Sequence, residues 1–448
     1  MYFAGTMRIN EKGNFEIGGC DTVDLAKQYG TPCNVLDEQL IRENCRKYSQ
    51  AFEKYYPDAK VIYAGKSFLT RALCRIMEEE GMHLDVVSGG ELYTALQADF
   101  PAENIFFHGN NKSKEELEMA LNAGVGRIVV DNFFELELLR ELTSERKNDC
   151  RILFRVNPQI EAHTHEYIKT GTEDSKFGFP LSTEEGLYDA VALVQKNQHL
   201  HLTGLHCHIG SQIFEREPFQ LAAETLLDSM VNIRDHYQLT LREINLGGGI
   251  GIRYTGDESP APIENHIEMI ARTVEEKTRA NEYPRPTIMV EPGRSITGEA
   301  GIMLYTIGAV KNIPGIRKYV SVDGGMSDNI RPALYNAEYT AIVSNKAGEE
   351  LEEKVNITGK VCESGDMLIQ DIRLPKVKEG DILAMLSTGS YTYSMASNYN
   401  GLTRPAVVLV KDGKSEVILE RENYQDLLKK DILPKRLTKN QRSFSIVN

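Results

Sequence analysis

The sequence predicts an α/β fold in which a (β/α)8 barrel of the TIM type is joined to a mainly β C-terminal domain. Eight short apolar runs alternate with segments of helical character, which is the order found in such barrels. Almost every run ends in a residue able to do chemistry. Barrel enzymes keep their working residues at the C-terminal ends of the strands, so both observations predict the same fold.

The expected barrel strands are regularly spaced at first and less so later. They are Val61–Lys66, His83–Ser88, Ile105–Gly109, Arg127–Asp131, Arg151–Asn157, Leu202–Gly210, Arg242–Gly249 and Thr287–Gly293. The first four begin at positions 61, 83, 105 and 127, and this even interval suits one compact strand–helix unit each time. The later intervals are longer, so we expect loop insertions there, one of them over residues 158–180.

Two parts of different character divide the chain. The barrel is expected over residues 39–299. After it the apolar runs become short and strand-like, and Lys411–Lys414 contains an Asp-Gly pair that suits a type I′ hairpin turn. We therefore expect residues 300–448, completed by the N-terminal strands of residues 1–38, to form a β-rich domain that contributes substrate and dimer contacts.

Composition excludes several classes of partner. The 448 residues are 41% hydrophobic and 26% charged, which is typical of a soluble protein. The formal net charge of −14 leaves no basic excess to neutralise phosphates, so we expect no nucleic-acid partner and no anionic membrane surface. No apolar run is long enough to span a bilayer.

Cysteine usage predicts the compartment. The seven cysteines are odd in number, scattered, and free of any C-x-x-C spacing. This pattern is typical of free thiols in a reducing environment. The first residues also lack the apolar segment of a secretion signal. A cytoplasmic location is therefore expected.

Lys66 and a glycine-rich turn end the first and seventh expected strands. An amine inside a barrel mouth is costly unless it is paired or used as a nucleophile, although a solvated surface lysine is the simpler interpretation of Lys66 alone. The run Asn245–Gly251 includes Gly247, Gly248 and Gly249. Such a run forms an oxyanion-binding nest or a tight turn that needs glycine.

The eighth expected strand ends in Glu291-Pro-Gly-Arg294. The bend at Gly293 would let Glu291 face the barrel axis while Arg294 reaches a ligand carboxylate. A local ion pair between the two charged side chains is the alternative interpretation. The motif predicts either an acidic group on the barrel axis or a structural pair.

His206 and His208 end the sixth expected strand and should share one face of it, because they are two residues apart. One hypothesis is a metal pair of a metal-dependent barrel hydrolase, completed from Asp85, His108 or Asp131. The other is a flat imidazole that packs on an aromatic ligand, with the second histidine structural.

Taken together, these motifs match the needs of pyridoxal 5′-phosphate. Its aldehyde requires a lysine amine, its phosphate an oxyanion nest, and its ring nitrogen an acidic partner. A lysine, a glycine nest, a carboxylate and a flat ring all point to one barrel mouth. We therefore expect this cofactor and no metal.

The same residues, with others in the β-rich part, resemble the fold-type III pyridoxal-phosphate decarboxylases. The resemblance runs from about Gly30 to Ala406. It rests on Tyr63–Lys66, Asp85–Glu91, Ser175–Gly178, His206–Gln212, Gly247–Gly251, Glu291–Arg294, Arg331–Tyr335, Cys362–Asp366 and Gly389–Asn400. The last three resemble the diaminopimelate branch of that family. Ser67-Phe68 and Ser390 depart from the residues usual in the family.

The resemblance implies specific roles. The implied cofactor site comprises Lys66, His206, Ser211, Gly247, Gly248, Gly249, Glu291, Gly293, Arg294 and Tyr391. The implied substrate contacts are Arg294, Arg331, Tyr335, Glu363 and Tyr391. Lys66 would hold the cofactor covalently, His206 would lie against its ring, and Cys362 would deliver a proton to the reacting carbon.

The implied reaction is the decarboxylation of meso-2,6-diaminopimelate to L-lysine and CO2, the last step of lysine biosynthesis. In the family, Cys362 and Glu363 would reach the site from a partner subunit, which implies a homodimer with shared sites. Arg294 and Arg331 would grip the carboxylate that is not lost, which ornithine and lysine lack. A decarboxylase of another diamino acid, or of a carrier-linked one, is the alternative within the family.

Overall fold

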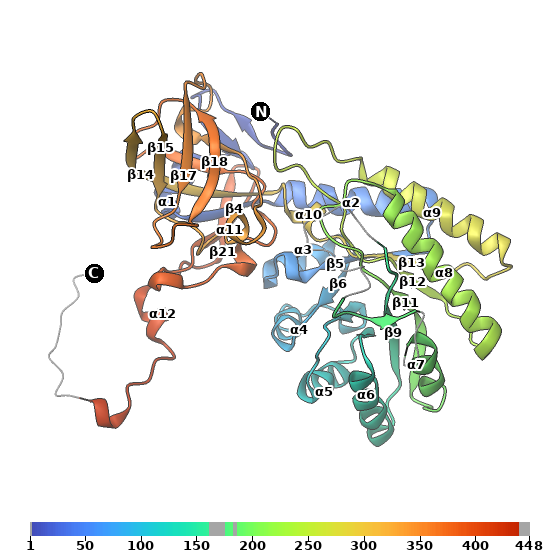
Figure 1. Ribbon diagram of the computed structural model, residues 1–448. Coiled ribbons are helices and arrows are strands. Elements are labelled where there is room, and N and C mark those ends of the chain that lie inside the picture. The colour runs from blue at the N-terminus through green and yellow to red at the C-terminus, as the bar shows by residue number, and fades with distance from the viewer. Residues whose placement is uncertain (1, 161–174, 182–185, 439–448) are drawn as a thin grey trace.

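The structure is a computed structural model that describes residues 2–160, 175–181 and 186–438. A barrel with its helices and a β domain lie side by side (Figure 1). Most of the insertion expected over residues 158–180 lies outside the described residues. Of the described helices, none combines the length and the apolar character needed to cross a membrane.

Eight parallel strands close the barrel. They are β5 (Ala59–Ala64), β6 (His83–Val86), β7 (Ile105–Phe107), β8 (Arg127–Val130), β9 (Cys150–Asn157), β11 (Leu200–His206), β12 (Glu243–Asn245) and β13 (Thr287–Val290). Neighbours pair in chain order, and β13 pairs with β5 to complete the ring. The short strand β10 (Phe179–Pro180) adds to β9. The predicted barrel is confirmed, because each expected strand begins within two residues of an observed one.

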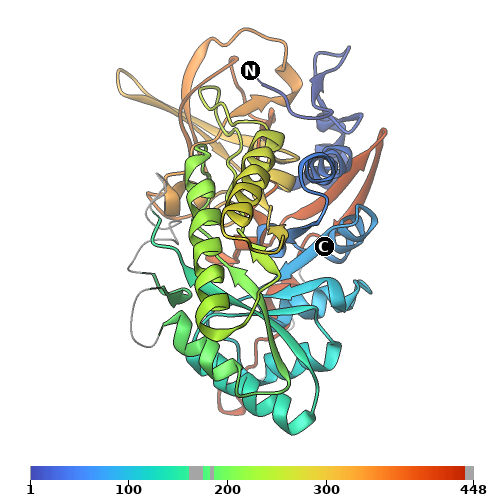
Figure 2. The same ribbon diagram turned by 90° about the vertical axis from the view of Figure 1, so that its right-hand side faces the viewer.

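Helices cover the outside of the barrel (Figure 2). They are α2 (Glu38–Tyr55), α3 (Arg71–Glu79), α4 (Gly89–Leu96), α5 (Lys114–Ala123), α6 (Phe133–Arg146), α7 (Leu187–Val194), α8 (Glu217–Tyr237) and α9 (Ile263–Ala280). Local sequence sets their ends. In α5, Ser113 and Glu116 form a capping box at the start, and Gly124 ends the helix with a φ of 73°.

The β domain combines both ends of the chain. Its strands are β1 (Arg8–Ile9), β2 (Phe15–Ile17), β3 (Cys20–Asp21), β4 (Cys33–Asp37), β14 (Gly301–Ile313), β15 (Arg317–Val322), β16 (Ala341–Val343), β17 (Glu353–Thr358), β18 (Met367–Leu374), β19 (Ile382–Met385), β20 (Ala406–Lys411) and β21 (Lys414–Leu419). Its sheet places β4 between β14 and β20. The N-terminal strand therefore completes the C-terminal sheet, as predicted.

Short elements connect these parts. The remaining helices are α1 (Thr22–Tyr29), α10 (Arg294–Thr297), α11 (Arg331–Tyr335) and α12 (Tyr424–Leu428). The predicted hairpin is confirmed between β20 and β21. Asp412 and Gly413 have φ values of 50° and 75°, as both central residues of a type I′ turn require.

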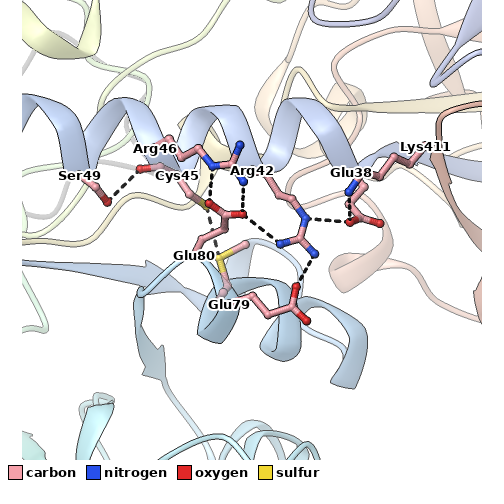
Figure 3. A network of polar contacts seen from close by, with 9 residues as sticks. Glu38, Arg42, Cys45, Arg46, Ser49, Glu79, Glu80 and Lys411 are labelled. Atoms are coloured by element: carbon pink, nitrogen blue, oxygen red, sulfur yellow. Dashed lines mark hydrogen bonds and ion pairs between the residues drawn. The ribbon is translucent and has the colours of Figure 1, made fainter.

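A network of charged side chains ties α2 to both parts of the molecule (Figure 3). It comprises Glu38, Arg42, Arg46, Glu79, Glu80 and Lys411. The guanidinium of Arg42 lies 2.7 Å from Glu79 at the end of α3 and 2.7 Å from Glu38. Glu38 also contacts Lys411 at the end of β20, at 3.1 Å. The network therefore links the barrel helices to the β domain.

The barrel interior is filled by apolar and paired polar side chains. Ile62, Phe106, Val129, Leu153 and Met289 form a separate buried cluster contributed by five of the barrel strands. Such a packed interior is typical of these barrels and leaves the chemistry to the C-terminal mouth.

One ion pair, between the segment joining β7 to α5 and the first turn of α6, is completely buried. The Nζ atom of Lys112 lies 2.7 Å from Glu135 and donates hydrogen bonds to the carbonyl oxygens of Gly109 and Val129. Lys112 is 2% exposed and Glu135 is 1% exposed. Removing the carboxylate that pairs with a buried cation strongly destabilises a protein, so the pair of Lys112 and Glu135 should contribute to the stability of the barrel.

We expect Glu135→Gln to lower the free energy of unfolding of the barrel by about 3 to 5 kcal/mol, because Lys112 would be left buried without a counter-charge. Urea unfolding of the cofactor-free protein measures this change. The control is Glu276→Gln, which removes the same charge from an exposed pair with Arg272 and should leave the unfolding curve unchanged. Equal urea unfolding curves for the two variants would contradict a stabilising role of the buried pair of Lys112 and Glu135.

Candidate active site

A cavity of about 410 Å³ lies at the C-terminal mouth of the barrel, against the β domain. Its lining includes eight residues that the sequence predicted: Lys66, His206, Ser211, Glu291, Arg294, Arg331, Tyr335 and Tyr391. Other lining residues are Val87, His108, Gly109, Asn110, Arg155, Phe177, His208 and Met395. The barrel supplies Lys66 and Glu291, whereas the β domain supplies Arg331 and Tyr391. The site is therefore built by both parts of the chain.

Lys66 lies in the 3-10 turn η1 (Gly65–Ser67), directly after β5. In the part of the chain that the structure describes, its amine has no hydrogen-bond or ion-pair partner. Burial alone would lower the pKa of Lys66, but the charges of Asp85, Tyr391 and Glu291 outweigh it and the net pKa is raised. The interpretation of Lys66 as a surface lysine is wrong, because the amine faces the cavity.

The carboxylate of Glu291 lies among three polar side chains at the barrel mouth. Its Oε1 atom accepts a hydrogen bond from Asn245 at 2.7 Å and lies 2.9 Å from His108 Nε2. Its Oε2 atom lies 3.1 Å from His206 Nε2. Burial by itself would raise the pKa of Glu291, but the contacts with His108 and His206 bring it well below its usual value.

The pKa of the neighbouring His206 is lowered as well, but here burial is the cause. Burial lowers the pKa of His206 to about 4, even though Glu291 opposes this shift. At neutral pH the imidazole is therefore uncharged and can donate its Nε2 proton to Glu291. The result is a single ionised carboxylate surrounded by donors, which is suited to a cationic partner inside the cavity.

Two buried arginines face the same cavity. Arg294 donates from Nη2 to Ser211 Oγ at 2.8 Å and from Nη1 to the hydroxyl of Tyr254. Arg331 donates from Nε to the hydroxyl of Tyr339 at 2.8 Å. Among the described residues, no carboxylate pairs with either guanidinium. Buried cations without counter-charge require an anionic ligand, so this arrangement favours phosphate and carboxylate groups.

Tyr391 is held in an unusual conformation between Lys66 and Arg294. Its φ is 58°, a left-handed value that is rare for an aromatic residue, and its N–H donates to Ser67 O at 2.7 Å. Its ring centroid lies 4.8 Å from Cζ of Arg294. The tertiary contacts thus force the ring into the cavity.

The glycine-rich turn has a packing role that the sequence did not show. Gly247, Gly248 and Gly249 do not line the cavity. A Cβ atom on Gly248 would lie 2.1 Å from the carbonyl oxygen of Glu291, and one on Gly249 would lie 2.5 Å from that of Gly210. Gly293 likewise packs against Ala64 and Ser67 beneath the lysine turn. Close backbone approach explains these glycines, and their contact with a phosphate stays a prediction.

Cys362 and Glu363 lie outside the cavity of their own chain. Both are exposed, on the loop between β17 and β18. The N–H of Cys362 donates to Asn400 Oδ1 at 2.8 Å, and the carboxylate of Glu363 accepts from the hydroxyl of Tyr399. The single chain therefore does not bring these two predicted residues to the other eight.

Comparison with known proteins decides the family. Residues 38–298 match the pyridoxal-binding domain of the pyridoxal-dependent decarboxylases. The chain is 52% identical to diaminopimelate decarboxylase of Bacillus subtilis strain 168, over 96% of this chain and 98% of that protein. It is 41% identical to that of Methanothermobacter thermautotrophicus, over 97% and 99% of the two chains.

The chain belongs to the diaminopimelate decarboxylase family. Solved structures agree: the enzyme from M. jannaschii has a TM-score of 0.91 at 35% identity, covering 97% of this chain and 99% of that one. The enzyme from Helicobacter pylori, complexed with L-lysine, has a TM-score of 0.82 at 30% identity, covering 91% and 98%. The predictions of a pyridoxal-phosphate-dependent decarboxylase and of its cofactor are confirmed.

The residues of the cavity fit this cofactor. Lys66 offers an amine that has no hydrogen-bond or ion-pair partner within residues 2–160, 175–181 and 186–438, and Glu291 offers an ionised carboxylate. Arg294 and Ser211 offer donors to an anion. The two departures from the family pattern are accommodated: Ser67 donates to the hydroxyl of Tyr63 at 2.9 Å, and Ser390 shares a hydrogen bond with Thr297 at 2.6 Å.

The metal hypothesis identified the wrong histidine pair. The described residues that could jointly hold an ion are His108, His206 and Glu291, whose ligand atoms all lie within 4.8 Å of one another. His208 is not among them, and its Nδ1 accepts from the N–H of Gly248 at 3.3 Å. Membership of a pyridoxal-dependent family favours the cofactor interpretation of these three residues.

Sequence reasoning missed several residues that shape the site. Arg155 lines the cavity at the end of β9, with its Cζ 4.2 Å from the ring centroid of Phe177. Its position at a strand end was a usable signal, as it was for His108. Asn245 acts through Glu291, and its place at a strand end was again a usable signal. Tyr254 and Tyr339 act through the arginines, and nothing in their local sequence marks them.

We expect Glu291→Gln to lower kcat at least roughly 100-fold, since a neutral amide cannot hold the cofactor ring protonated. Borohydride reduction should still attach the cofactor to Lys66, and steady-state kinetics measures the loss. Unchanged kcat with intact cofactor binding would contradict the role of Glu291.

Proposed function

We propose that the protein decarboxylates meso-2,6-diaminopimelate to L-lysine and CO2, with pyridoxal 5′-phosphate held on Lys66. Its membership of the diaminopimelate decarboxylase family supports this activity. The proposed substrate rests on one observation. Arg294 and Arg331 are two buried guanidiniums without a carboxylate partner among the described residues. They suit a substrate that keeps a carboxylate at its non-reacting end.

The chemistry divides between the cofactor and the chain. When bound, the cofactor would supply a protonated pyridine ring as an acceptor for the electron pair that remains on the α-carbon when CO2 leaves. Glu291 stays ionised and holds the proton on the ring nitrogen. His206 stays neutral and would lie against the ring of the bound cofactor. Ser211 and Tyr391 would hold the phosphate, with the glycine turn as a further predicted contact, and Arg294, bonded to Ser211, would connect that phosphate side to the substrate side.

We expect the enzyme to reject substrates that would leave the buried charge of Arg331 unpaired. A substrate without the distal carboxylate, such as ornithine, would leave Arg331 buried without an anion. A site that hydrogen-bonds a missing group rejects the analogue by about 10⁴-fold. Tyr335 lies beside Arg331, with its ring centroid 5.5 Å from Cζ, and completes this end of the cavity. Another diamino acid or a carrier-linked substrate is the alternative.

The second half of the site is proposed to come from another copy of the chain. Cys362 and Glu363 are exposed and lie outside the cavity of their own chain. In a homodimer with shared sites, Cys362 would protonate the reacting carbon and Glu363 would bind the distal ammonium. We further propose a cytoplasmic location, and residues 39–299 as the cofactor-binding domain beside a domain of residues 1–38 and 300–448.

A carbon-dioxide release assay tests the substrate. We expect release from meso-diaminopimelate, and about 10⁴-fold lower kcat/KM for ornithine, arginine and lysine. Arg331→Ala should raise KM for diaminopimelate about 100-fold, because a buried charged contact is lost, while the absorbance of the bound cofactor stays unchanged. Comparable release from ornithine would instead support the alternative, and loss of cofactor from Arg331→Ala would refute its assigned role.

Subunit mixing tests the shared site. Lys66→Ala and Cys362→Ala should each be inactive, but after dissociation and reassociation their mixture should recover roughly a quarter of wild-type activity, because half of the dimers would contain one intact site. Lys66→Ala mixed with Glu291→Gln is the control. Both lesions lie on the barrel side, so no intact site forms. Equal results from the two mixtures would contradict a shared site.

A further inference from the structure

Tyr254 belongs to the barrel by sequence but packs in the core of the β domain. It lies in the loop between β12 and α9, yet its neighbours in the buried cluster include Met303, Val343 and Met385. The same cluster contains Tyr339, between α11 and β16. Tyr254 is 6% exposed and Tyr339 is 4% exposed. The two rings meet edge to face, with centroids 5.1 Å apart and an interplanar angle of 82°.

Each of these tyrosines holds one arginine of the cavity. The hydroxyl of Tyr339 accepts from Nε of Arg331 at 2.8 Å, and the hydroxyl of Tyr254 accepts from Nη1 of Arg294. The ring centroid of Tyr254 also lies 5.7 Å from Cζ of Arg294 and 5.8 Å from Cζ of Arg331. One aromatic ring therefore contacts both guanidiniums and attracts them electrostatically, whereas no carboxylate of the described residues pairs with either.

The bond to Tyr339 also determines which atoms Arg331 presents. Since Nε is occupied, the terminal nitrogens remain, and in the described part of the chain neither has a hydrogen-bond partner. A guanidinium fixed at Nε presents its two terminal nitrogens as a planar fork to a carboxylate. Neither tyrosine lines the cavity, so both act through the arginines.

We propose that Tyr254 and Tyr339 are positioning residues that hold Arg294 and Arg331 in one rigid fork across the domain boundary, and so set the preference for a ligand that carries a distal carboxylate. This inference rests on the proposed function, because it assigns the fork to the end of the substrate that does not react. A mobile Arg331 side chain would lose conformational entropy when it binds the carboxylate. Because Tyr339 already orders this side chain, less entropy is lost on binding.

The test compares two ligands that differ only in that carboxylate. L-Lysine, bound as the product of the reaction, keeps the single carboxylate of the non-reacting end, and cadaverine is the same diamine without it, so the ratio of their inhibition constants reports on the fork. We expect Tyr339→Phe to raise the inhibition constant of L-lysine and the KM of meso-diaminopimelate about tenfold, the effect of one lost hydrogen bond to a charged group. The inhibition constant of cadaverine, kcat and the cofactor absorbance should change less than about twofold.

Tyr254→Phe should behave in the same way through Arg294. The matched control is Tyr283→Phe, which removes a buried hydroxyl that donates to the carbonyl of Leu241 at 3.0 Å, away from the cavity. It should leave the ratio of the two inhibition constants unchanged.

Two outcomes would overturn the inference. One is an equal weakening of L-lysine and cadaverine by Tyr339→Phe, which would indicate a general disturbance of the cavity. The other is no change in either ligand. Failure of the proposed function is distinguishable, because it would appear as a wild-type protein that releases no carbon dioxide from meso-diaminopimelate.

Discussion

The buried carboxylate of Glu291 is the interaction on which the site depends. An ionised group in the protein interior costs several kcal/mol unless donors surround it. Here β11 supplies His206, β12 supplies Asn245, and the end of β7 supplies His108. These donors converge because the parallel strands of a closed barrel all end at one mouth. The same closure places Lys66, from the first strand, next to Glu291, from the last.

The second constraint is that the anion-binding groups come from both sides of a domain boundary. Arg294 follows the last barrel strand, whereas Arg331 opens α11 in the β domain. Their geometry therefore depends on how the two parts sit against each other. Tyr254 enters the β-domain core, and the network around Arg42 ties α2 to β20. The arrangement of the two arginines therefore depends on domain packing, since a shift of either part would move one arginine away from the other.

Gly248 and Gly293 allow close backbone approach, because they have no side chain, and neither lines the cavity itself. The turn at Gly248 passes so close to the carbonyl of Glu291 that any side chain would collide with it, and Gly293 leaves room for the turn that carries Lys66. These glycines let the ends of β12 and β13 approach each other. The position of Glu291 therefore depends on residues that themselves do not face the cavity.

The sequence by itself determined the barrel, the hairpin at Asp412 and half of the residues that line the cavity, because strand periodicity and strand ends are local properties that a closed parallel barrel converts into proximity. It did not show the packing role of the glycine turn. It also could not show that Tyr254 leaves the barrel to join Tyr339. Those features depend on which distant segments meet, and only the tertiary structure decided them, since the burial and hydrogen bonding that define them do not exist in the isolated segments.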